Sequence, residues 1–167
     1  DGRLYETLFF KDEYFNDTVA KRVYDKTYDE WFQGADKQVF RKYMPADAAG
    51  LSAAYFAPNI VLMRYANVLL MKAEALNELE AIPLVNEVRK RAGMPAMKGA
   101  TREAVRAQIE HERMLEFPLE NMRFYDLRRW GKTKEVLHAA GRSNFDPSKH
   151  NFYPIPIQEI NSNNAID

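Results

Sequence analysis

The helix expected after Thr101 constrains the fold most, because it places two carboxylates inside an apolar helical face. If residues 102–117 are helical, one line at three- and four-residue spacing contains Val105, Ile109, Glu112 and Glu116. An isolated ionised carboxylate in an apolar interior costs several kcal/mol or more, so each glutamate needs a cationic partner. We therefore expect this helix to pack against elements that carry arginines.

Two interpretations of Glu112 and Glu116 follow from their surroundings. The first is a structural ion network with charged groups close by in the sequence, namely Arg113, Arg123, Asp126, Arg128 and Arg129. The second is an acid/base pair for glycoside cleavage, in which one carboxyl group must stay protonated. Neighbouring arginines hold carboxylates ionised, whereas a general acid needs a raised pKa, so the sequence favours the network.

The sequence predicts no metal site, no cofactor and no enzymatic activity. The run His111–Leu115 begins like the zinc-binding HExxH helix, but position 115 is leucine instead of the second histidine. There is no cysteine and no glycine-rich phosphate loop. The histidines also lack a nucleophile or metal partner at a recognisable spacing; they are His111, His138 and His150.

The charge balance excludes proteins that bind polyanions through a basic surface. Lysine plus arginine equals aspartate plus glutamate at 24 each, so we expect no nucleic-acid partner. The 167 residues are 46% hydrophobic and contain no run of eighteen apolar residues. These values are typical of one soluble globular domain.

Residues 1–58 are expected to form an irregular, aromatic-rich segment that joins an upstream chain, because no helical or strand period persists through them. Aromatic side chains recur there at roughly helical spacing, at Tyr24, Tyr28, Trp31 and Phe32. Two interpretations stay open: packing against a neighbouring domain, which is the more common role, or a platform on which sugar rings stack. The second interpretation makes Trp31, Tyr28 and Phe32 ligand-binding candidates.

Residues 59–167 are expected to be helical, which gives a mainly α fold. A long helix should begin with Asn59 as its N-cap and bury most of its circumference through two apolar stripes. The first stripe is Leu62, Ala66, Leu69, Ala73 and Leu76, and the second is Val61, Tyr65, Val68, Ala75 and Leu79. After a very short turn, a second helix begins near Pro83 and ends at Gly93, which completes a tetratricopeptide-like hairpin.

The remaining elements are shorter. Thr101 should cap the helix that carries the two glutamates, and Pro118 should stop it. Short helices are expected over residues 122–130 and from Thr133 to Gly141. The prolines at 154 and 156 predict an extended ribbon that lies across the helices before a final helical turn at residues 158–160.

Four motifs in a fixed order resemble the C-terminal part of the SusD/RagB family of Bacteroidetes outer-membrane lipoproteins. They are RYANVLLMKAEALNE, LVNEVRKRAGMP, IEHERMLEFPLENMRFYDLRRWG and FYPIPIQEI, within about residues 59–161. The resemblance implies tetratricopeptide-like hairpins with irregular loops and no catalysis. It also implies a surface-exposed component of polysaccharide utilisation that binds a glycan or peptide over a SusC-like TonB-dependent transporter and serves nutrient uptake.

The family has an N-terminal lipid anchor on a cysteine, which this chain does not contain, so we expect a C-terminal fragment or a partial sequence. Two departures from the family concern structure. Asn121 stands where the family has glycine, which is acceptable because asparagine tolerates a left-handed conformation. The Glu80–Ala81 junction lacks a few loop residues that the family has. The alternative function is a helical-repeat scaffold whose ligands are other proteins.

The motif residues resemble the family's scaffold and not its ligand site, since family glycan contacts lie mostly in upstream segments. They are Arg64, Tyr65, Glu74, Asn86, Arg89, Arg91, Glu112, Arg113, Glu116, Arg123, Asp126, Arg129 and Trp130. The identity of the ligand and the oligomeric state do not follow from the sequence.

Overall fold

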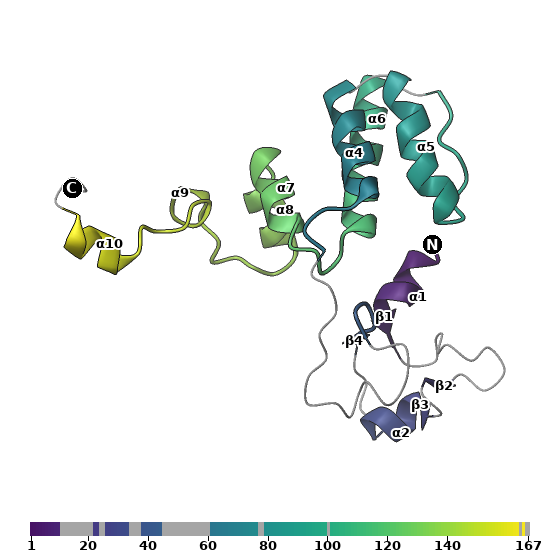
Figure 1. Cartoon of the computed structure of the whole chain (residues 1–167), viewed down its shortest axis with the longest axis horizontal. Coiled ribbons are helices and arrows are strands. Elements are labelled where there is room, and N and C mark those ends of the chain that lie inside the picture. Colours follow the sequence, from purple (N-terminus) through teal and green to yellow (C-terminus); the bar gives the residue numbers. More distant parts are fainter. Residues whose placement is uncertain are drawn as a thin grey trace. The chain divides into compact units, whose positions relative to one another are not determined.

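The computed structural model describes residues 1–10, 22–23, 26–33, 38–44, 61–76, 79–99, 101–163 and 165. Helices dominate these residues, which confirms the predicted fold class (Figure 1). The chain divides into two compact units, Asp1–Glu120 and Asn121–Asp167, and each is described by itself. The predicted boundary between residues 58 and 59 lies outside the described residues and stays a prediction.

The N-terminal part of unit 1 consists of short elements. They are α1 (Arg3–Thr7), β1 (Leu8–Phe9), β2 (Arg22–Val23), β3 (Lys26–Thr27), α2 (Tyr28–Phe32) and β4 (Val39–Phe40). Strands β1 and β4 pair antiparallel, with Leu8 opposite Phe40, and β2 pairs antiparallel with β3. The pairing of β1 with β4 places residues 41–44 next to α1, because Arg41 N–H donates to the Thr7 carbonyl at 2.8 Å.

Three helices form the core of unit 1: α4 (Tyr65–Leu76), α5 (Ile82–Arg91) and α6 (Arg102–Glu116), with the 3-10 turn η1 (Leu79–Ala81) between α4 and α5. Each helix packs against the other two, as Figure 1 shows. Ala66, Leu69 and Ala73 of the first apolar stripe are buried, whereas Leu62 and Leu76 of that stripe are exposed, which corrects the prediction for these two residues. The buried contacts are Leu69, Leu70, Ala73, Val85, Val88, Val105 and Ile109.

Helix α4 begins later than the sequence predicts. The proposed N-cap, Asn59, lies outside the described residues, but residues 61–64 are described and are not helical. The helix begins at Tyr65, and the Arg64 carbonyl accepts the Asn67 N–H at 2.8 Å. The Arg64 side chain donates to Glu120 and to the Glu116 carbonyl at the end of α6. The residue directly before α4 therefore takes part in an ionic contact and not in another helical turn.

The second apolar stripe of α4 is exposed, which corrects the prediction that most of the helix circumference is buried. Tyr65 is 66% exposed, and Val61, Val68 and Leu79 are also exposed. Only Tyr65, Val68 and Ala75 of this stripe lie within α4, whose buried residues are Ala66, Asn67, Leu69, Leu70 and Ala73. An apolar pattern reports which residues favour burial and not how many neighbours are present to bury them.

The boundaries of α5 agree with the sequence. Pro83 lies in its first turn, and Gly93 adopts a left-handed φ of 67° just beyond its end. The Gly93 N–H donates to the Lys90 carbonyl and the Met94 N–H to the Arg89 carbonyl, which closes the helix in a Schellman arrangement. The Glu80–Ala81 junction lies within η1, which leads directly into α5.

Helix α6 also matches its prediction. The Thr101 side chain accepts the Ala104 N–H at 3.3 Å and caps the first turn. Val105, Ile109 and both glutamates of the predicted line are buried. The helix ends at Glu116, and Pro118 follows shortly after.

Unit 2 contains α7 (Arg123–Arg129), α8 (Thr133–Ala139), α9 (Pro147–His150) and α10 (Ile157–Ser162). Asn121 has a φ of 57°, so the left-handed conformation predicted at this position is confirmed. The predicted ribbon is mostly exposed instead of covered, with Phe152 at 73% and Tyr153 at 75%. It is attached through Asn151, whose carbonyl accepts from Arg128 at 2.9 Å.

Among the described residues, no helix combines the length and the apolar character that a bilayer crossing requires.

The Thr101 cap provides a direct test of the fold. Replacing Thr101 with alanine leaves the Ala104 N–H without its side-chain acceptor, so we expect unfolding to become easier by about 1 kcal/mol. Urea titration monitored by tryptophan fluorescence measures the change. Thr101→Ser is the matched control and should keep nearly all of the stability, because serine retains the capping oxygen; an equal loss in both variants would contradict the capping role.

Candidate functional site

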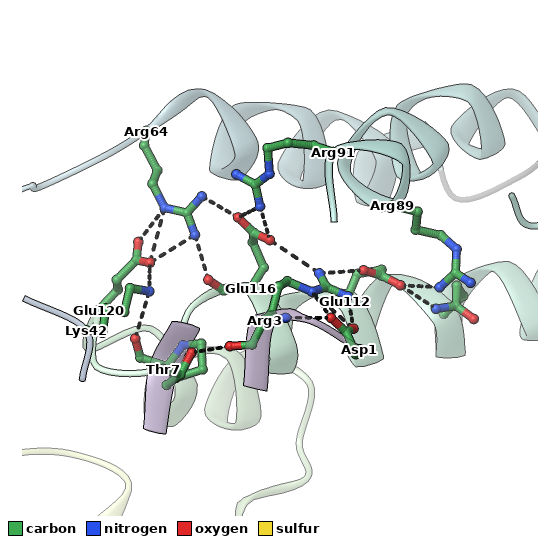
Figure 2. A network of polar contacts seen from close by, with 12 residues as sticks. Asp1, Arg3, Thr7, Lys42, Arg64, Arg89, Arg91, Glu112, Glu116 and Glu120 are labelled. Carbon is green, nitrogen blue, oxygen red and sulfur yellow. Dashed lines mark hydrogen bonds and ion pairs between the residues drawn. The ribbon is translucent and has the colours of Figure 1, made fainter. Parts of the chain in front are cut away.

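The two glutamates of α6 lie at the centre of an ion network that joins five parts of unit 1 (Figure 2). Glu112 is fully buried. Its carboxylate accepts from Arg3 of α1 at 2.8 Å, from Arg89 of α5, and from Gln108 one turn earlier on α6 at 2.8 Å. Three donors therefore surround one buried carboxylate, which satisfies the requirement that its burial imposes.

Glu116 accepts from three arginines. Arg3 donates at 3.2 Å, and Arg64 and Arg91 donate from the start of α4 and the end of α5. Burial alone would raise the pKa of this carboxyl group, but the hydrogen bonds and positive charges of Arg91 and Arg64 outweigh that effect. The pKa of Glu116 is therefore held below its ordinary value, and the group is a carboxylate at neutral pH.

Glu120 extends the network beyond the end of α6. It accepts from Arg64 Nε at 2.8 Å and from Lys42 at 2.5 Å, and Lys42 also donates to the Pro118 carbonyl at 3.0 Å. Burial opposes ionisation of Glu120 too, but the hydrogen bonds from Arg64 and Lys42 lower its pKa below the ordinary value. Burial alone would lower the pKa of Arg64, but its hydrogen bonds and ion pairs with Glu120 and Glu116 raise it above the ordinary value.

Further contacts fix the orientation of these groups. The guanidinium of Arg64 lies 4.6 Å from the ring centre of the buried Phe117, and that of Arg113 lies 5.1 Å from it. Arg113 Nη1 also donates to the Asn67 amide oxygen at 2.9 Å. On α5, the Asn86 amide bonds both the N–H and the carbonyl of Met97, at 2.7 and 3.0 Å, and so ties down the loop that leads to α6.

The burial of Glu112 and Glu116 and their pairing with arginines confirm the first part of the sequence prediction. The predicted partners were arginines of the segment 123–129, which lies in unit 2, and that assignment stays a prediction. The described partners are Arg3, Arg64, Arg89 and Arg91, all within unit 1. Sequence proximity did not point to these four arginines, because other elements of unit 1 supply the contacts.

The other predicted network residues lie in different described interactions. Asp126 is buried and accepts from Arg129 one turn later on α7, at 2.9 and 3.0 Å. Arg113 is buried and contacts Asn67 and Phe117, as described above. Arg123 begins α7, and its predicted place in the network stays a prediction.

Sequence reasoning missed Arg3, Lys42 and Glu120 as members of the network. Arg64, Arg89 and Arg91 were recognised as scaffold residues but not as partners of the glutamates. Arg89 and Arg91 lie in the last turn of α5, but no local pattern in the sequence shows that this turn lies beside the last turns of α6. The contribution of Arg3 has no local signal, because 109 residues separate it from Glu112.

The network is suited to holding helices together and not to acid/base chemistry. A glycosidase acid must keep a proton near neutral pH, whereas the pKa of Glu116 is lowered. Among the described residues, no group of three or more histidine, cysteine, aspartate or glutamate side chains is placed to hold a metal ion.

The predicted ligand-binding aromatics form a small cluster in unit 1. Tyr28 is only 6% exposed, and the partly buried Trp31, Phe32 and Met44 pack against it. The Thr27 side chain and Glu30 form a capping box that begins α2. The structure brings the three candidates together, but most of the Tyr28 ring faces its neighbours, so Trp31 and Phe32 present the more accessible rings. Tyr24 lies outside the described residues, and ligand binding by this cluster stays a prediction.

This helical architecture with an arginine-bound pair of glutamates agrees with the family resemblance, and comparison with known proteins shows the family directly. The sequence model of the SusD family matches residues 1–167, so the chain belongs to the SusD family.

Two relatives come from Formosa agariphila. The chain is 34% identical over 144 residues to SusD-like protein P2. This match covers 77% of this chain and 28% of the relative. The chain is 40% identical over 92 residues to SusD-like protein P38. This second match covers 47% of this chain and 18% of the relative.

A solved structure agrees with the fold. A SusD superfamily protein from Bacteroides vulgatus matches with a TM-score of 0.77 and 28% identity. The match covers 98% of this chain and 38% of that protein. The chain therefore spans well under half the length of the relatives it matches.

Loss of Glu116 should destabilise the protein strongly. In Glu116→Ala, Arg3, Arg64 and Arg91 lose a shared carboxylate that is 2% exposed, so we expect a loss of about 3 kcal/mol of unfolding free energy. Chemical denaturation measures it. The control is Glu87→Ala on the exposed side of α5, which should change stability by less than about 0.5 kcal/mol. Similar, small effects of both substitutions would show that the network does not hold the helices together.

The lowered pKa values of Glu116 and Glu120 predict sensitivity to acid. Their stabilising contribution is fully present above the unfolded carboxyl pKa, near about 4.3, and is lost as pH falls through the lower folded pKa. Urea midpoints measured from about pH 7 to about pH 3 should therefore fall steeply below about pH 5. The double variant Glu116→Gln/Glu120→Gln should start lower and decline less, and an equally steep decline would assign the acid sensitivity to other groups.

Proposed function

We propose that this chain belongs to a cell-surface protein that binds an oligosaccharide or a peptide without transforming it and delivers it to a TonB-dependent outer-membrane transporter. The observation that carries the proposal is membership of the SusD family across residues 1–167. In this proposal the protein is a surface-exposed lipoprotein of the outer membrane. Its immediate partner is a SusC-like β-barrel transporter.

The ion network supports a binding role over a catalytic one. In every described contact of its carboxylate, Glu116 accepts a hydrogen bond from an arginine. The group therefore holds no proton that it could transfer to a leaving group. The network instead links α1, α4, α5 and α6, which is the property that a rigid support for a binding surface requires.

Within this chain, the aromatic cluster on α2 is the proposed ligand contact. Trp31 is partly exposed, and the Lys26 ammonium lies 5.0 Å from its ring centre. Aromatic faces stack on sugar rings, and a neighbouring ammonium can donate to sugar hydroxyls. Tyr28 would act from beneath by holding Trp31 and Phe32 in place.

The test uses the full-length protein. A glycan array should show at least one specific ligand, and pull-down from an outer-membrane extract should recover a large β-barrel transporter. Trp31→Ala should weaken ligand binding about tenfold, since loss of one stacked ring costs roughly 1–1.5 kcal/mol. Trp130→Ala in unit 2 is the matched control and should bind as the parent does.

Three results would contradict the proposal. A blank array together with recovery of only other partners would favour the helical-repeat scaffold. Release of reducing sugar from a polysaccharide, abolished by Glu112→Gln, would show that the carboxylates are catalytic. Equal binding by the Trp31→Ala variant and the parent would move the ligand contact away from α2.

A further inference from the structure

A pocket of about 210 Å³ opens beside the ion network of unit 1. A single water needs only about 10–15 Å³ of such space, so the pocket holds more than isolated water. Its wall is predominantly basic. The charged lining residues are Arg3, Lys42, Arg64 and Arg91, with Glu6 and Glu116 as the acidic members.

The charges around this pocket do not balance among the described residues. The Glu6 side chain is 70% exposed and pairs with Arg41, so these two opposite charges cancel and are left out of the count. In the remaining network, five basic side chains meet four acidic ones: Arg3, Lys42, Arg64, Arg89 and Arg91 against Asp1, Glu112, Glu116 and Glu120. One positive charge is left without a counterpart.

The geometry places this surplus on Arg91. Its side chain is 57% exposed, far more than those of Arg3 and Arg64, at 12% and 25%. Arg64 uses Nε, Nη1 and Nη2 in the network, and so does Arg3. In its contacts with the described residues, Arg91 uses only Nη2, which donates to Glu116 (Figure 2).

We propose that this pocket is a binding site for a small oxyanion, a carboxylate or a sulfate group, held by the donors of the Arg91 guanidinium that Glu116 does not use. These donors are Nε–H and Nη1–H, which lie on opposite edges of the planar group, so each can donate one hydrogen bond to an oxygen of the anion. Arg3, Arg64 and Lys42 add positive potential from the other walls. Glu116 fixes the Arg91 side chain through Nη2, so little side-chain entropy is lost on binding.

The proposal is independent of the aromatic cluster and of glycan binding, and the 167-residue chain is sufficient to test it. Sodium sulfate and sodium acetate are titrated separately against the chain, with sodium chloride adjusted to keep the ionic strength constant. In the parent, the Tm should rise and then level off as the site fills, because the anion binds the folded state. In Arg91→Gln this saturable shift should be lost.

The control variant removes the same charge elsewhere. Arg106→Gln takes away an arginine of α6 that is 54% exposed and pairs with Glu110. It should keep the full saturable shift. Sulfate also stabilises proteins by exclusion from their surface, which gives an unsaturable rise. If the parent and both variants show the same rise, the site does not exist.

A second measurement does not depend on the stability of the variant. In the folded parent, the side-chain Nε–H signal of Arg91 in a ¹⁵N correlation spectrum should move with sulfate or acetate, while that of Arg106 should stay fixed. Movement with acetate alone identifies a carboxylate site, and movement with sulfate alone identifies a sulfate site. No movement with either anion overturns the proposal.

Discussion

The burial of two carboxylates on α6 is the constraint on which unit 1 depends. Removing Glu112 and Glu116 from water is tolerated only because arginines from α1, the start of α4 and the end of α5 converge on them. Each helix is consequently fixed at a defined height along α6, since a shift by one turn would separate a guanidinium from its carboxylate. The apolar contacts and the ion pairs both hold the helices together, and the ion pairs also set their register.

Local signals in the sequence predicted most of the helical part. Thr101 and Gly93 define helix ends through backbone hydrogen bonds that involve only a few neighbouring residues, so their effect is readable without knowledge of the fold. The left-handed conformation of Asn121 belongs to the same category. The line of Val105, Ile109 and the glutamates likewise follows from helical periodicity alone.

Three features could not be predicted, because each depends on contacts between distant residues. The described arginine partners of the glutamates come from other elements of unit 1, to which sequence proximity did not point. Helix α4 begins only after Arg64, whose side chain donates to the Glu116 carbonyl, whereas the apolar run from residue 61 predicts an earlier start. The exposure of Tyr65 and Val68 depends on which side of α4 its neighbours occupy. The aromatic candidates on α2 were brought together as predicted, although the burial of Tyr28 was not foreseen.

The bond between Arg3 and Glu112 has a consequence for the order of folding. It closes a loop of 109 residues, whereas Arg89 reaches the same carboxylate across 23. The entropy lost on closing a loop grows with the length of the loop, so we expect the contact of α5 with α6 to form before that of α1 with α6. Docking of α1 then completes the set of counter-charges late in the process. Helix α1 thus supplies a donor to Glu112 only after α5 and α6 have packed together, and we expect its contact with α6 to be lost early in the unfolding of unit 1.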